Sequence, residues 1–197
     1  MSQCTLIILD SGPLNSLWVA DRLDLLLTLD MRLVLVDTVY DELTSDLTDP
    51  RDRAVKAFID GNQPPFIIET TGVGALERER RSKGGKPKKN AGEVSVVSFL
   101  TSADGFRKYV GTGDPVAILY EDAAIRLVSN PPNLHMLSTV GMLRGLEYVD
   151  IIPSADTIIH EMTHPSKPDR RPEYRRVATD LPDGIDDPAA IGSTRVP

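Results

Sequence analysis

The sequence predicts an α/β fold, a parallel, doubly wound α/β/α sandwich of about five strands. Short apolar runs of strand length alternate with helical patterns along the first 160 residues. Strands that are separated by helices pair in parallel, and the helices cover both faces of the sheet. From Pro165 onward, six prolines and few large apolar residues appear. We therefore expect one folded domain at residues 1–164 and a flexible, proline-rich tail at residues 165–197.

The first elements follow from apolar patterning and turn residues. Leu6–Asp10 is an apolar run of strand length, and the turn-forming residues 11–13 close it. Pro13 suits the first turn of a helix whose apolar residues continue to Leu29, and Asp37 suits the N-cap of a later helix. The further strands are expected at Arg32–Val36, Pro65–Glu69, Val116–Tyr120 and Leu134–Leu137. The further helices are expected at Thr38–Thr48, Pro50–Asp60, Val73–Ser82, from Asn90 to about Ala103, at Ala123–Val128, Ser138–Leu146 and Ser154–Met162.

Composition and charge limit the cellular compartment and the classes of binding partner that we expect. A single cysteine, Cys4, excludes an internal disulfide and favours a reducing compartment. No apolar run approaches the ~20 residues of a membrane span, and the apolar run near the N-terminus is too short for a signal peptide, so we expect a cytoplasmic protein. A net charge of −7 argues against broad binding of nucleic acid. Residues 77–89 differ, because seven basic side chains stand there against two acidic ones, a local balance of +5.

Acidic residues stand where a nuclease would need them. Asp10 ends the first strand, and Glu121 and Asp122 follow the strand at Val116–Tyr120. Ligand sites in parallel sheets form at the carboxyl ends of strands. Glu42 and Glu93 lie near the starts of helices. Several carboxylates in one place repel one another unless they share a cation, and a site of oxygen ligands alone selects Mg²⁺ or Mn²⁺. Such ions promote phosphodiester hydrolysis.

Each acid also has a purely structural interpretation. Asp10 could form a turn with the residues after it, and Glu42 could form a surface ion pair. Glu93 stands three residues after Asn90, the spacing of a capping box. The acidic pair could simply complement a helix dipole. These interpretations do not predict the order of the acids along an α/β chain, and that order favours a shared site.

Five stretches of residues 4–162 together resemble the PIN-domain family of metal-dependent nucleases, which includes toxins of toxin–antitoxin pairs. The stretches are residues 6–14 with Asp10, 34–43 with Glu42, 90–97 with Glu93, 117–126 with Glu121 and Asp122, and the strand-to-helix turn at 137–144. The resemblance implies an endoribonuclease with Mg²⁺ or Mn²⁺ as cofactor. Its metal-binding and catalytic residues would be Asp10, Glu42, Glu93 and either Glu121 or Asp122, with assistance from Ser11.

The resemblance also suggests partners. RNA would be the substrate, an antitoxin would occupy the acidic cleft, and homodimers are common in the family. The basic loop leads directly into the helix of Glu93, so it could hold an RNA backbone beside the acids. Its candidate RNA-binding residues are Arg78, Arg81, Lys83, Lys86, Lys88 and Lys89. Relatives often have Asp where Glu93 stands, and this tail and loop are longer than in compact toxins.

Three alternatives remain open. The chain could be a PIN-like module that binds RNA or protein without cleaving. A phospho-acceptor receiver or a haloacid-dehalogenase-like phosphatase also places Asp at a strand end, but Gly12 stands where the phosphatase needs a second Asp. His160 and His164 flank Glu161 in the spacing of a zinc-peptidase helix, without an evident third ligand.

Overall fold

A computed structural model describes residues 4–86, 88, 91–121 and 131–170, and it contains a five-stranded parallel sheet in the order β3-β2-β1-β4-β5. The strands are β1 (Thr5–Ile8), β2 (Arg32–Val36), β3 (Phe66–Glu69), β4 (Val116–Tyr120) and β5 (Leu134–Ser138). The α-helices are α1 (Gly12–Val19), α2 (Asp37–Leu43), α3 (Pro50–Gly61), α4 (Gly72–Ser82), α5 (Ala91–Thr101), α6 (Ala103–Gly105), α7 (Thr139–Tyr148) and α8 (Ala155–Thr163). The 3₁₀ segments are η1 (Leu23–Leu29) and η3 (Pro168–Arg170), and η2 (Phe106–Val110) is π-helical. The expected doubly wound α/β/α class is confirmed.

The middle strands are buried on both faces, which explains why their sequences are almost continuously apolar. Every residue of β1 is buried, and Ile7 pairs with Val34 of β2 and Ile118 of β4. Side chains on a strand alternate between the two faces, so a strand covered on both faces needs apolar residues at every position. The core therefore runs through the sheet rather than along one side of it.

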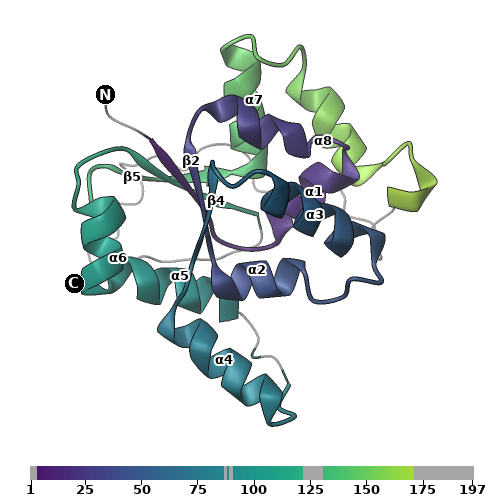
Figure 1. Cartoon of the computed structure of the whole chain (residues 1–197). Helices are drawn as coiled ribbons and strands as arrows, with labels where there is room; N and C mark the ends of the chain where they lie inside the picture. Colours follow the sequence, from purple (N-terminus) through teal and green to yellow (C-terminus); the bar gives the residue numbers. More distant parts are fainter. Residues whose placement is uncertain (1–3, 87, 89–90, 122–130, 171–197) are drawn as a thin grey trace, which may run out of the picture.

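Helices cover both faces of the sheet (Figure 1). On one side α1 packs against α3 and α8, and α7 packs on α8. On the other side α5 contacts α6 and η2. Helix α2 lies beside α4 and α5, and α4 projects away from the sheet (Figure 1).

The strand order reverses direction between β1 and β4. The chain moves from β1 outward to β2 and β3, and then returns across the sheet to β4 and β5. At such a reversal the connections leave to opposite sides, which opens a crevice beyond the carboxyl ends of the two strands. Glu121 directly follows β4 and Asp10 stands two residues after the end of β1, so the topology places both at the reversal point.

The first helix was predicted to extend to Leu29, and that prediction was wrong. Helix α1 ends at Val19, and Asp21 adopts a left-handed backbone with φ 59°. The amide of Arg22 donates to the carbonyl of Leu17 at 2.8 Å, as in a Schellman C-cap. Glycine usually occupies the left-handed position, so an aspartate there gave no stop signal in the sequence.

The remaining elements mostly agree with the expectations. Strand β4 has the predicted bounds, while α2 ends at Leu43 rather than Thr48. The segment 103–110 forms α6 and η2, where no element was expected. The helix expected at Ala123–Val128 and the cap at Asn90 lie outside the described residues.

The part of the tail that the structure describes packs against the end of α1. Arg170 lies over the ring of Trp18, 5.0 Å from its centroid, and its Nη2 is 2.7 Å from Oδ1 of Asp21. Lys167 pairs with the same carboxylate. Residues 165–170 of the predicted flexible tail (165–197) are therefore held on the domain, and the rest of that tail, residues 171–197, lies outside the described residues. Within the described ranges, no helix is long and apolar enough to cross a membrane.

Candidate functional site

Asp10 and Glu121 meet at the reversal point of the sheet. The amide of Glu121 donates to Oδ2 of Asp10 at 3.1 Å, and the amide of Gly12 donates to Oδ1 at 2.7 Å. Both carboxylates are buried, with 8% and 2% of their residue surfaces exposed. A Cβ at Gly12 would lie 2.7 Å from Oδ1 of Asp10 and 2.8 Å from Cβ of Glu121. Only glycine fits between these two acids without displacing them.

Hydroxyl groups hold the buried carboxylate of Glu121. Ser16 on α1 donates to Oε1 at 2.5 Å, and Thr139 at the start of α7 donates to Oε2 at 3.0 Å. A buried carboxylate without partners is costly, and hydrogen bonds to a charged group are stronger than those between neutral groups. Glu121 therefore links the end of β4 to α1, which precedes this strand in the sequence, and to α7, which follows it. The sequence reasoning missed Ser16 and Thr139, because Ser16 lies opposite the stripe of Leu14, Leu17 and Trp18, where a polar residue gives no signal of burial.

Glu42 reaches the same region through Ser11. The Ser11 hydroxyl donates to Oε1 of Glu42 at 2.8 Å, and Ser11 is the neighbour of Asp10 in the chain. Oε2 of Glu42 lies 3.7 Å from the position that a Cβ on Gly92 would take. The start of α5 therefore packs against α2, and Glu93 is the next residue after Gly92 in the first turn of α5.

The structure thus brings three of the predicted acids to one edge of the sheet. Asp10 and Glu121 are joined directly, and Glu42 is joined through Ser11. Glu93 is partly exposed in the first turn of α5, and Asp122 lies outside the described residues. In the described part of the chain, no three carboxylate, imidazole or thiolate groups are arranged so that they could hold a metal ion. Convergence of the four acids on one ion stays a prediction.

Asp37 is a second buried carboxylate at a strand end, and its expected role as an N-cap was wrong. Val36 is the N-cap of α2, and Asp37 is the first helical residue. Its carboxylate accepts hydrogen bonds from the amide and hydroxyl of Thr71 and pairs with Nη1 of Arg78 at 2.7 Å. A Cβ at Gly74 would lie 2.2–2.4 Å from this carboxyl group. Asp37 therefore fixes the start of α4, and its partners there, Thr71 and Arg78, lie far from it in the sequence.

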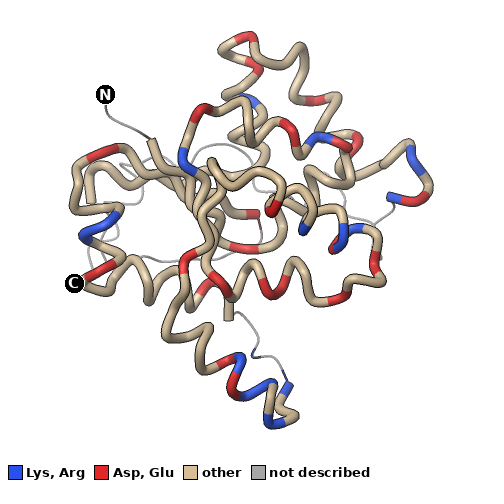
Figure 2. The backbone as a smooth tube through the Cα atoms, viewed as in Figure 1, with Lys and Arg blue, Asp and Glu red and all other residues tan. Residues whose placement is uncertain are grey.

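The basic residues of the candidate RNA-binding set differ in their availability. The hydrogen bond with Asp37 raises the pKa of Arg78, and this arginine holds α4 in place. Lys83 pairs with Glu79, and Arg81 is partly buried. Lys86 and Lys88 are exposed, while Lys89 lies outside the described residues. Figure 2 shows the basic positions gathered at the projecting end of α4.

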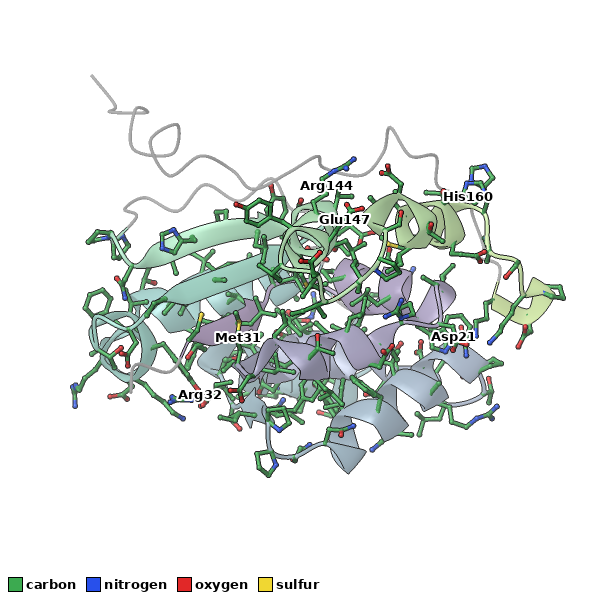
Figure 3. The ribbon with its side chains drawn as sticks, turned by 90° about the horizontal axis from the view of Figure 1, so that it is seen from above. Asp21, Met31, Arg32, Arg144, Glu147 and His160 are labelled. Atoms are coloured by element: carbon green, nitrogen blue, oxygen red, sulfur yellow. The ribbon has the colours of Figure 1, made fainter. Side chains whose placement is uncertain are left out.

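A cavity of about 550 Å³ opens at the other end of the sheet from the acids. Met31 and Arg32 line it at the start of β2, beside Pro65 and Ile67 at β3 (Figure 3). Its walls are mostly apolar, and none of the predicted site residues lines it. The candidate site therefore rests on the carboxylates at the reversal point and not on this cavity.

Comparison of the chain with protein-family models yielded no match. The curated proteins and the solved structures likewise contained no match to it. The resemblance to the PIN-domain family therefore rests on the residues of the chain itself, and what it implies about function stays a proposal.

Proposed function

We propose that the protein is a Mg²⁺- or Mn²⁺-dependent endoribonuclease whose centre lies at Asp10 and Glu121. The observation that carries this proposal is that the backbone amide of Glu121 donates to the carboxylate of Asp10, so that two buried acids stand side by side in the fold at the reversal point of the sheet. The residues are 111 positions apart in the chain, and a 3.1 Å hydrogen bond joins them. Ligands bind at this point in open parallel sheets, and paired acids there supply the oxygen ligands that hard cations require.

A cation at this centre would share the two carboxylates with the hydrogen bonds that hold them. An ionised carboxylate has about four lone-pair sites. Asp10 accepts hydrogen bonds from two backbone amides, and Glu121 accepts them from two hydroxyls. Glu42 is exposed on α2, so its side chain can turn from Ser11 toward Asp10 at little cost. Glu93, or Asp122 beyond the described residues, would complete the ligands.

The bound ion would polarise a phosphate and lower the pKa of a water molecule. The chain's own part is to fix the geometry. Ser16 and Thr139 prevent the Glu121 carboxylate from rotating, and the amide of Gly12 does the same for Asp10. Preorganised groups of this kind need no rearrangement when charge develops on the phosphate.

The projecting end of α4 supports RNA as the substrate. The exposed ammonium groups of Lys86 and Lys88 lie on the segment that leads into α5, the helix of Glu93. Such contacts add affinity through the phosphate backbone without selecting a sequence. A toxin role would fit this activity, and an antitoxin could then insert a basic side chain among the acids. Homodimerisation is proposed on the resemblance alone.

Cleavage of a mixed RNA pool tests the proposal, with Mn²⁺, with Mg²⁺ and with chelator. Asp10→Asn should abolish the metal-dependent cleavage, while Asp104→Asn, an exposed acid on α6, should leave it unchanged. An amide at position 10 can accept only one of the two backbone N–H groups, so that variant loses stability as well. Glu42→Gln is the second variant, because Glu42 is exposed and its loss should spare the fold. Wild-type cleavage by folded Asp10→Asn or Glu42→Gln would refute the assignment.

A PIN-like module that binds RNA or a protein without cleaving is the second candidate. The observation that favours it is that no three potential metal ligands come together within the described ranges. Such a module would gain no thermal stability from Mn²⁺, since only an ion bound to the folded state stabilises it. A rise in Tm with Mn²⁺ that disappears in Glu42→Gln would favour the nuclease.

A further inference from the structure

Two imidazole rings stack at the end of α8. The ring centroids of His160 and His164 are 4.9 Å apart, and the ring planes differ by 10°. The spacing of four residues places both side chains on one side of the last helical turn. His160 is exposed, and Figure 3 shows it on the outer side of α8, pointing away from the sheet. His164 is the C-cap residue and is partly exposed.

A hydrogen bond to Thr163 holds one ring nitrogen of His164. The Thr163 hydroxyl lies 3.2 Å from the carbonyl of Ile159, 3.1 Å from that of His160, and 2.9 Å from Nδ1 of His164. The contact engages Nδ1, so Nε2 is the nitrogen through which His164 would bind a metal. With Nε2 on a metal, Nδ1 would carry the hydrogen and donate it to the Thr163 oxygen, as in metal-binding histidines whose other nitrogen is held by a hydrogen bond.

We propose that His160 and His164 form a two-imidazole site for a divalent transition metal such as Zn²⁺ or Ni²⁺. Imidazole suits these ions, whereas Mg²⁺ prefers oxygen ligands. Zn–N bonds of about 2.0–2.1 Å in tetrahedral geometry require the two nitrogens to be about 3.3 Å apart. Rotation of the exposed His160 ring brings its nitrogen toward Nε2 of His164, which Thr163 holds fixed. The negative end of the α8 dipole also favours a cation here.

This site differs from the zinc-peptidase motif that the spacing suggests. In such a motif the Glu after the first histidine serves as the general base. Here Oε2 of Glu161 accepts a hydrogen bond at 2.9 Å from the amide of Ser166, which directs it toward the segment after α8. Within the described residues no third ligand group joins the two histidines. Water would fill the other positions, so the site binds a metal without the peptidase constellation, and it is independent of the acidic centre.

Titration calorimetry of the full chain with NiCl₂ and ZnCl₂ at pH 7.5 tests the proposal. His160→Ala and His164→Ala should each weaken binding by more than about tenfold, since loss of an outer partner alone costs about that much. His135→Ala, on β5, is the matched control and should bind as the wild type does. Excess Mg²⁺ should not displace Ni²⁺.

Thr163→Val tests the role of this hydrogen bond, because valine keeps the shape of threonine but removes the oxygen that would accept from Nδ1 when Nε2 binds the metal. We expect Ni²⁺ binding to weaken by about tenfold. Unchanged affinity in either His160→Ala or His164→Ala would overturn the two-imidazole site. Equal loss in His135→Ala would overturn it as well.

Discussion

Gly74 on α4 offers a sharp test of how the structure positions this helix. A methyl group at this position would lie 2.2 Å from Oδ2 and 2.3 Å from Oδ1 of Asp37. These are far inside a normal van der Waals contact, so the carboxylate must move. Only 6% of Asp37 is exposed, and Thr71 and Arg78 hold its carboxylate. Displacement of the carboxylate therefore breaks these hydrogen bonds, and burial prevents water from replacing them.

The expected cost of Gly74→Ala follows from two terms. Overpacking costs about 1–3 kcal/mol, and a lost hydrogen bond to a charged group costs about 1.5–3 kcal/mol. Alanine recovers about 1 kcal/mol of helix propensity, which leaves a net loss of about 1.5–5 kcal/mol. For a domain of this size, such a loss lowers Tm by roughly 3–20 °C.

Gly72→Ala is the matched control, because Gly72 stands in the same turn of α4 and a Cβ there meets nothing within 4 Å. It should be neutral or slightly stabilising. Urea unfolding of both variants measures the difference. If Gly74→Ala and Gly72→Ala have the same stability, the steric reasoning is refuted. In an Asp37→Ala background, Gly74→Ala should cost much less stability, because the carboxylate that the methyl group meets is gone. If the cost is undiminished, the strain arises from another contact.

Three further predictions concern other contacts. Ser16→Ala removes a donor from the buried Glu121 carboxylate and should cost about 1–3 kcal/mol in urea unfolding, so unchanged stability would contradict the role given to that hydroxyl. The pKa of Asp21 is lowered, chiefly by its hydrogen bond with Lys167. The stabilisation is therefore present above the unfolded pKa of about 3.9 and is lost as the pH falls through the lower folded pKa. The stability difference between wild type and Asp21→Asn should follow that course, and a difference that persists at lower pH would speak against the contact. Lys86→Glu should weaken RNA binding and reduce its dependence on salt, whereas an unaltered salt dependence would remove the α4 end from the interface.

The strands were predictable because their signal is local. Strands β1 and β4 are continuous apolar runs bounded by turn residues, and a strand buried on both faces needs such a run wherever it lies in the sheet. Asp10 and Glu121 were found for the same reason, since each directly follows one of these runs. Parallel pairing then put the carboxyl ends at one edge.

The end of α1 was not predictable from its apolar pattern. Leucines continue through η1 with helical spacing, so periodicity alone gives no reason for the helix to stop. The stop comes from Asp21 in a left-handed conformation, and Asp150 does the same after α7. An aspartate tolerates this backbone but does not require it, so the residue type signals the turn weakly.

The sequence by itself determined the α/β class, most element positions and the acids that follow the strands, because backbone periodicity and turn chemistry act over a few residues. The tertiary structure alone decided which side chains hold those acids. Ser16 meets Glu121 across 105 positions, and Thr71 meets Asp37 across 34. Such pairs depend on how helices pack on the sheet, because a buried carboxylate accepts from the donors that the packing brings close to it. No local pattern in the sequence predicts which donors these are.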